Sequence, residues 1–193
     1  MITLASGSET RATLLRNAGL DVSIRPARID EATVIESLLA DGASARDVAD
    51  TLAEMKASKP AVDGLVLGAD QVLAHGGTLL QKPADPDAAR GQLRALRGRQ
   101  HRLLSAAVIV EDGRPVWRHV GEVRLVMRDL SDAYVDDYVD RNWDRICHCV
   151  GCYQLEAEGA RLFTRVDGDY FTVLGLPLLA VLDFLATRGV IRT

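Results

Sequence analysis

An aspartate that ends an apolar run and a lysine shortly after it are the first groups in this sequence that could do chemistry. Asp70 ends LVLGAD, residues 65–70, and Lys82 follows Gly76-Gly77, a pair expected to turn the chain back so that Lys82 returns close to Asp70. A carboxylate can hold a divalent metal or take a proton from water, and a lysine can neutralise phosphate oxygens. These are the groups that cleavage of a pyrophosphate bond requires. An aspartate that only caps a turn and a solvated lysine are the plain alternatives.

A small polar loop near the N-terminus could bind an anion. Ser6, Gly7 and Ser8 precede an amphipathic run, and Arg11 follows in its first turn. Hydroxyls and free backbone N–H groups at the positive end of a helix dipole attract phosphate, and glycine lets the backbone approach it closely. Arg11 could make a bidentate contact with the same anion. Ser8 as a simple helix N-cap is the alternative, and both roles are compatible.

Alternating strand and helix patterns must position these groups. Strands are expected at residues 2–6, 22–25, 65–70 with an extension over 71–74, 78–81, 101–111 and 115–127, with strands and turns over 151–175. Helices are expected at residues 11–18, at 34–59 with a break near Gly42, and at 85–96, 130–139 and 177–188, with Ser44, Asp85 and Ser131 as caps. This alternation predicts an α/β fold with a mixed sheet flanked by helices. In such sheets ligands gather beyond the carboxyl ends of strands, where Asp70 is expected.

Length and charge narrow the class of protein. The chain has 193 residues, a net charge of -4 and 48% hydrophobic residues, which suits one domain or two small lobes of a globular protein. A general nucleic-acid binder needs a basic surface, so no nucleic-acid partner is expected. No run approaches the roughly 20 apolar residues of a membrane span, and the N-terminus lacks the pattern of a signal peptide. A cytoplasmic protein without membrane partners is the expectation.

The three cysteines cluster in Cys147-His148-Cys149-Val150-Gly151-Cys152. Such a group could bind zinc or act in redox chemistry, but a structural zinc site usually draws on a second, separated pair of ligands. In a strand, Cys147 and Cys149 would also point away from His148. Buried or unreactive thiols are therefore the favoured interpretation.

Six short blocks, in order along the chain, carry a family resemblance. LASGSETRATLL at residues 4–15 resembles the LASxSPRRxxLL opening of the Maf family of nucleotide pyrophosphatases, the septum-formation-inhibitor-like proteins. The other blocks are IDE at 29–31, LAEMKA at 52–57, LGADQV at 67–72, QKP at 81–83 and VLGLPL at 173–178. Each block alone is weak, but their common order is specific and covers nearly the whole chain.

The resemblance implies a fold and an activity. Residues 1–193 would form a single Maf-like domain with an elongated sheet and two lobes around a central cleft, related to the inosine triphosphate pyrophosphatases. Its reaction would cleave a nucleoside triphosphate between the α and β phosphates, with a divalent metal, Mg²⁺ or Mn²⁺. A homodimer is also implied.

The resemblance also assigns residues. Asp70 would activate water or hold the metal, and Glu31 would be a second acidic group near it. The groups facing the phosphates would be Ser8, Arg11, Lys56 and Lys82, and the loop that carries Ser8 also offers the hydroxyl of Ser6 to the substrate.

Two positions bear on the base. The branch of the family that acts on dTTP and UTP usually has Thr after the GAD aspartate, whereas this chain has Gln71 there and Glu156 in YQLEAEG, similar to the 7-methyl-GTP branch. A carboxylate accepts both the N1–H and 2-amino donors of guanine, and methylation at N7 makes N1–H more acidic. Uracil and thymine instead suit an amide that both donates and accepts. We therefore expect 7-methyl-GTP as the preferred substrate; a dTTP/UTP enzyme and a non-catalytic, nucleotide-binding regulator of cell division are the alternatives.

The first loop departs from the family pattern. Glu9 and Thr10 replace the usual proline and first arginine, which removes one cation and adds an anion. Glu9 would repel a triphosphate unless it points away from the loop or helps to hold the metal.

Overall fold

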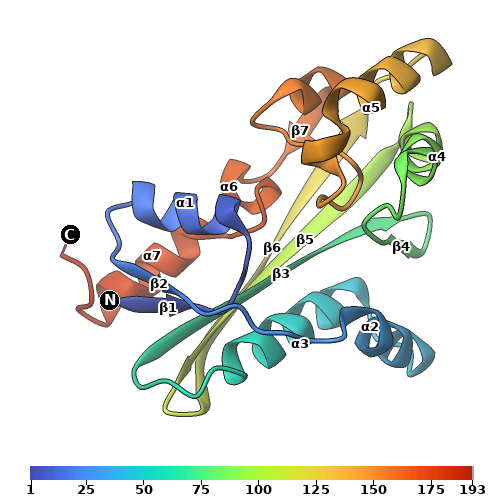
Figure 1. The fold of residues 1–193 in the computed structure, drawn as a ribbon. Helices are drawn as coiled ribbons and strands as arrows, with labels where there is room; N and C mark the ends of the chain where they lie inside the picture. Colours follow the sequence, from blue (N-terminus) through green and yellow to red (C-terminus); the bar gives the residue numbers. More distant parts are fainter. Residues whose placement is uncertain (193) are drawn as a thin grey trace. The chain divides into compact units, whose positions relative to one another are not determined.

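The computed structural model describes residues 1–192. They fall into two compact units, one made of residues 1–71, 104–121 and the stretch from Asp169 onward, the other of Val72–Leu103 and Glu122–Gly168. A seven-stranded sheet has the order β2-β1-β3-β5-β6-β7, with β4 paired to β3 (Figure 1). Parallel and antiparallel pairs both occur, so the predicted α/β class with a mixed sheet flanked by helices is confirmed. The cleft and the single domain over residues 1–193 stay predictions.

The first unit is built on short parallel strands covered by helices. β1 (Ile2–Leu4) pairs in parallel with β2 (Val22–Ile24) and with the start of β3 (Leu65–His75). In Figure 1, α1 (Glu9–Asn17) and α7 (Leu178–Thr187) lie on one side of these strands, and α3 (Ala45–Ser58) lies on the other. The helix α2 (Glu31–Ala40) precedes α3, and the short α6 (Tyr170–Val173) precedes α7. All three residues of β1 are buried, as expected for a strand covered on both faces.

Close packing of α3 on β3 depends on a residue without a side chain. A Cβ on Gly68 would lie 2.8 Å from Cβ of Ala57, and closer still to backbone atoms of α3. Any other residue at this position would push the helix away from the strand. The apolar core nearby includes Leu4, Leu15, Leu67, Ile109 and Val181.

The predicted helix caps are present. Ser44 and Asp47 form the capping box of α3, in which each side chain accepts a hydrogen bond from the other's backbone N–H. Asp85 caps α4 (Pro86–Leu96), and Ser131 caps α5 (Asp132–Ile146). These local hydrogen bonds explain why the helix starts could be predicted closely.

Two hairpins were also predicted and are confirmed. β3 pairs antiparallel with β4 (Thr78–Leu80), with Leu73 opposite Leu80. The strands β5 (Gln100–Glu111) and β6 (Arg114–Met127) are neighbours joined by Asp112 and Gly113, whose φ angles are 51° and 77°. Positive φ at both positions is the geometry of the two-residue turn that matches the twist of paired strands.

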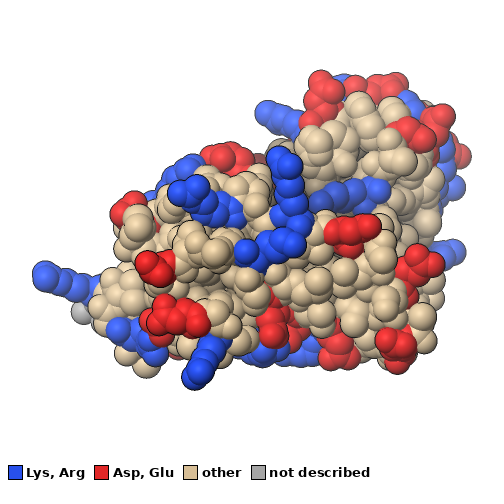
Figure 2. Space-filling model, turned by 60° about the horizontal axis from the view of Figure 1, so that its bottom comes forward, with Lys and Arg blue, Asp and Glu red and all other residues tan. Residues whose placement is uncertain are grey.

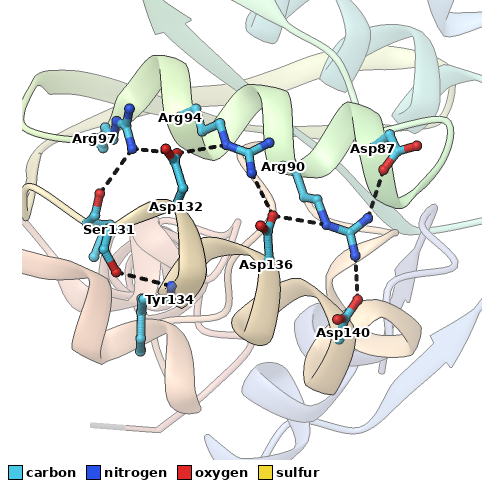
Figure 3. Close-up of polar contacts among 10 residues, drawn as sticks. Asp87, Arg90, Arg94, Arg97, Ser131, Asp132, Tyr134, Asp136 and Asp140 are labelled. Carbon is cyan, nitrogen blue, oxygen red and sulfur yellow. Dashed lines mark hydrogen bonds and ion pairs between the residues drawn. The ribbon is translucent and has the colours of Figure 1, made fainter.

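The second unit contains α4 and α5 packed side by side. Figure 3 shows ion pairs between two arginines of α4, together with its C-cap residue Arg97, and three aspartates of α5. We call these residues the α4–α5 ladder: Arg90, Arg94, Arg97, Asp132, Asp136 and Asp140. Their spacing of three or four residues places them along one face of each helix.

The prediction for residues 151–175 was wrong in part. Only β7 (Phe163–Asp167) is a strand; it follows the 3-10 helix η1 (Glu158–Leu162), and α6 occupies the end of the segment. Cys147 caps α5 and the residues after it form turns, so the strand alternation considered for the cysteines does not apply. Gly and polar residues favour turns, and tertiary packing decided which of these turns closed into helices.

Acidic and basic side chains are interspersed on the face drawn in Figure 2. Within residues 1–192, none of the helices has both the length and the apolar character that crossing a membrane would require.

Candidate active site

The centre of the candidate site is a group of three ionisable side chains in the first unit, two of them buried and the third partly exposed. Asp70 lies in the middle of β3 and not at the end of a strand as expected, because β3 continues to His75 in its hairpin with β4. Lys56 lies in the last turn of α3. The Nζ atom of Lys56 is 2.5 Å from Oδ1 of Asp70 and 2.6 Å from Oε1 of Glu31, the first residue of α2. Only 8% of the side-chain surface of Lys56 and of Asp70 is exposed. The structure thus brings together Glu31, Lys56 and Asp70, the three residues expected near one another in the site.

Burial controls the protonation of Asp70. The loss of water around the carboxyl raises the pKa of Asp70, while the charges of Lys56 and Arg11 oppose this rise and Glu31 adds to it. A carboxylate with a raised pKa is a better proton acceptor than an ordinary aspartate. Perturbed acids of this kind are concentrated at functional sites, which agrees with the predicted role of Asp70.

Arg11 donates hydrogen bonds to two backbone carbonyl groups and to one side chain. Its Nε donates to the carbonyl oxygen of Gly175 at 2.8 Å, and its Nη1 donates to Ala69 O at 3.0 Å and to Ser6 Oγ at 3.2 Å. Burial lowers the pKa of Arg11, and the charges of Asp70 and Glu31 oppose this. Arg11 therefore holds the residue next to Asp70, while its contact with a phosphate stays a prediction.

The serines of the first loop hydrogen-bond within the loop. Ser6 is buried and its Oγ accepts from the backbone N–H of Ser8 at 3.2 Å. Ser8 is the N-cap of α1, where its Oγ accepts from the backbone N–H of Arg11 at 3.4 Å. The cap is confirmed, and the binding of a phosphate by these hydroxyls stays a prediction.

Glu9 forms an ion pair along its own helix. Its Oε1 is 2.9 Å from Nη1 of Arg16, and three quarters of its side chain is exposed (75%). The acid that replaces the family's proline is therefore partnered by a cation of α1.

Gln71 is held by its amide nitrogen. Nε2 donates to Ser105 Oγ at 2.9 Å and to the carbonyl oxygens of Thr172 and Val173 at 3.1 and 3.0 Å. Sequence reasoning missed Ser105 and Thr172. A lone serine inside the apolar run LLSAAVIV was the available signal for Ser105, because a buried hydroxyl requires a partner.

Lys82 and Glu156 belong to the second unit and are both exposed. Both affect Cys149: burial raises the pKa of this thiol to about 11, the charge of Glu156 adds to the rise and that of Lys82 opposes it. The nearness of Lys82 to Asp70, and of Glu156 to Gln71, stays a prediction.

Cys147, Cys149 and Cys152 are free thiols, and burial raises the pKa of Cys152 to about 12, which makes its reactive thiolate scarce.

Comparison with known proteins decides the family. A family described as "Maf-like protein" matches residues 1–188. The chain belongs to the Maf family. It is similar to a "Nucleoside triphosphate pyrophosphatase" of Roseobacter denitrificans, with 64% identity over 189 residues covering 96% of this chain and 95% of the relative. Proteins with the same description from Ruegeria sp. and Caulobacter vibrioides are 58% and 47% identical, and each alignment covers at least 96% of both chains.

The metal expected of a Maf protein can be tested against the donors present. Oxygen atoms of Glu31 and Asp70 converge on one point, the Nζ of Lys56, and carboxylate oxygens suit Mg²⁺ or Mn²⁺. Within residues 1–192, no three His, Cys, Asp or Glu side chains are grouped so that they could hold a metal ion. Mg²⁺ commonly binds through one or two carboxylates plus substrate phosphates, so this pair fits a metal that arrives with its nucleotide.

Proposed function

We propose that this Maf family protein, a nucleoside triphosphate pyrophosphatase and hence a hydrolase, cleaves the bond between the α and β phosphates and prefers 7-methyl-GTP. The observation that carries the proposal is the buried Asp70, with a raised pKa and an ammonium group 2.5 Å away. An ion pair that only stabilises the fold could lie at the surface at little cost in free energy. A buried ion pair costs more, because both charged groups lose their water. Its position beside the Arg11 loop, in a chain that matches the family almost from end to end, favours a catalytic role.

In the proposed reaction, Asp70 orients a water molecule and takes its proton. The water oxygen bonds to the α phosphorus while the bond from that phosphorus to the bridging oxygen breaks, and the products are the nucleoside monophosphate and pyrophosphate. Lys56 and Lys82 neutralise charge on the phosphate oxygens, and the first loop with Ser8 and Arg11 binds the triphosphate. A divalent cation held by Glu31 and Asp70 would supply further neutralisation of the phosphates.

The preference for the base rests on Glu156 and Gln71. A carboxylate accepts hydrogen bonds and cannot donate, so Glu156 favours the adjacent N1–H and 2-amino donors of guanine. The positive charge of a 7-methylguanine base strengthens this interaction. Uracil and thymine present one N–H between two carbonyl oxygens, and a carboxylate would be repelled by those oxygens.

A nucleotide panel tests the proposal. Pyrophosphate release from 7-methyl-GTP, GTP, UTP and dTTP is measured with Mg²⁺ and with Mn²⁺, and the highest kcat/KM is expected for 7-methyl-GTP. A higher kcat/KM for UTP or dTTP would support the alternative substrate class. Nucleotide binding without hydrolysis of any triphosphate would support the non-catalytic regulator.

Glu156→Gln isolates the base preference. Because a hydrogen bond to a charged group contributes about 1.5–3 kcal/mol, the preference for 7-methyl-GTP over UTP should fall by at least about tenfold. Asp144→Asn, an exposed acid of the same unit, is the matched control. An unchanged preference in Glu156→Gln would remove Glu156 from base recognition while leaving the pyrophosphatase activity in place.

A further inference from the structure

Ser105 is a polar residue inside an apolar strand. It lies in β5 among buried residues, and none of its surface is exposed (0%). Its Oγ donates to the carbonyl oxygen of Thr172 at 2.7 Å and accepts from Nε2 of Gln71 at 2.9 Å. The hydroxyl has one hydrogen, which it donates in the hydrogen bond to the Thr172 carbonyl, so only a lone pair remains to face Gln71.

The surroundings of Gln71 fix the orientation of its amide. Its nitrogen faces three acceptors, namely Ser105 Oγ and the carbonyl oxygens of Thr172 and Val173. Rotation of the amide by half a turn would place Oε1 against two carbonyl oxygens and remove the hydrogen bonds of Nε2 to all three acceptors. Both hydrogens of the amide are therefore used within the first unit, and Oε1 is the polar atom of this side chain left for a substrate.

The segment that supplies the two carbonyl groups is anchored independently of Gln71. Asp169 accepts hydrogen bonds from the backbone N–H of Thr172 at 2.7 Å and from its Oγ1 at 2.8 Å. Arg11 binds the carbonyl of Gly175 at 2.8 Å, and a Cβ on Gly121 would lie 2.7 Å from Oγ1 of Thr172. The acceptors thus have a fixed place before any nucleotide binds, as a preorganised site requires.

We propose that Ser105 is a positioning residue for base selection, which orients the Gln71 amide so that only its carbonyl oxygen faces the base. The inference rests on the proposed function and deepens it. Gln71 follows Asp70 directly in the chain, and its side chain is partly exposed. An acceptor at this position selects a base edge with N–H donors, such as N1–H and the 2-amino group of guanine. It gives no hydrogen bond to the carbonyl oxygens of uracil or thymine, which a freely rotating amide could give.

The first test is Ser105→Ala, read as the ratio of kcat/KM for 7-methyl-GTP to kcat/KM for UTP. Loss of the hydroxyl removes one of the three acceptors of Nε2 and one donor from the Thr172 carbonyl, so the orientation of the amide is held less firmly. We expect the ratio to fall by about tenfold, mainly through KM, with Ser37→Ala at an exposed serine as control. A lower melting temperature with an unchanged ratio would show a purely structural role and overturn the proposal.

A double-mutant cycle shows whether Ser105 acts through Gln71. In a Gln71→Ala background, Ser105→Ala should not change the ratio further, because no amide remains to be oriented. An equal change in both backgrounds would overturn the proposal. If Ser105→Ala does not fold, Ser105→Cys replaces the hydroxyl with a weaker donor and acceptor of similar shape, and a wild-type ratio there would count against the role.

The wild-type measurement separates this inference from the proposed function. A wild type that prefers 7-methyl-GTP while the cycle is additive contradicts only the role of Ser105. A wild type that releases no pyrophosphate from any nucleotide overturns the proposed function and this role with it.

Discussion

Two groups of ionised side chains, one in each unit, differ in how water reaches them. In the first unit, Lys56 and Asp70 are almost fully buried, and the ammonium group of Lys56 pairs with the carboxyl groups of both Asp70 and Glu31. In the second unit, the α4–α5 ladder lies at the surface, where 65% of the Asp140 side chain and 64% of Asp132 are exposed. The first group has few charges in a poorly solvated place, and the second has many in a well solvated one.

The exposure of each group to water determines how much its ion pairs can contribute to stability. Exposed ion pairs are screened and each contributes about 0–1 kcal/mol, so the ladder adds modestly to the packing of α4 on α5. Removing two charges from water costs several kcal/mol per ion, and an apolar pair of similar volume would often be no less stable. Stability alone therefore does not explain Lys56 and Asp70, whereas the proposed chemistry on a phosphate would.

The largest effect is expected for Asp70→Asn. The amide keeps the shape of the carboxyl but cannot take a proton from water, so pyrophosphate release should fall by about 10²–10⁴-fold. Asp63→Asn, an exposed acid of the same unit, is the control. Activity within a few fold of wild type in Asp70→Asn would assign the buried group to structure instead.

Lys56→Met should cause the largest loss of stability. It leaves the Asp70 carboxyl buried without its cation and beside Glu31, which should cost about 3–5 kcal/mol in the free energy of unfolding. Removal of Lys56 takes away a charge that opposes the raised pKa of Asp70, so protonation at lower pH should relieve the defect.

Urea unfolding of this variant at pH 8 and pH 5 measures the difference, with exposed Lys59→Met as control. A loss of the same size at both pH values would contradict the explanation by uncompensated charge.

His101 is a buried titratable group in the second unit, in contrast to the exposed charges of the α4–α5 ladder. Burial lowers the pKa of His101 to about 4, and its Nε2 lies 2.8 Å from the hydroxyl of Tyr153. The folded state therefore holds the neutral ring, so stability is full above the unfolded pKa of about 6.5 and is lost as pH falls toward 4. The loss should reach about 3 kcal/mol.

The difference in unfolding free energy between wild type and His101→Gln, followed from pH 7 to 4, isolates this contribution. His148→Gln replaces an exposed histidine of the same unit and serves as the matched control. A difference that does not vary with pH would show that His101 does not titrate as its burial requires.

The smallest effect is expected in the ladder itself. Arg90 pairs with Asp87, Asp136 and Asp140, and Arg90→Gln should cost about 1 kcal/mol at low salt and less at 1 M salt, where the Debye length is about 3 Å. Unfolding by urea at two salt concentrations measures this, and pyrophosphate release should stay at the wild-type level. A loss of unfolding free energy that does not depend on salt would show that the charges around Arg90 are shielded from solvent, as those of Lys56 and Asp70 are.

The sequence determined the features that depend on near neighbours. The caps Ser8, Ser44, Asp85 and Ser131, and the β3–β4 hairpin, were all predicted, because a cap or a two-residue turn is decided by residues within a few positions. Asp70 was found for a related reason: an acid at the end of an apolar run stands out in the sequence. The structure places it inside β3 instead of at the end of a strand. The resemblance added Glu31 and Lys56, which spacing alone did not indicate.

Only the tertiary structure decided the partners of these side chains. Arg11 binds the carbonyl of Gly175, 164 residues away in the chain, and Ser105 binds the carbonyl of Thr172, 67 residues away. The 3-10 helix and α6 were also missed, since the segment 151–175 has turn-forming residues that suit several conformations. Residue types state which hydrogen bonds and charges must be satisfied, but backbone carbonyls occur at every position, so packing alone selects the partner.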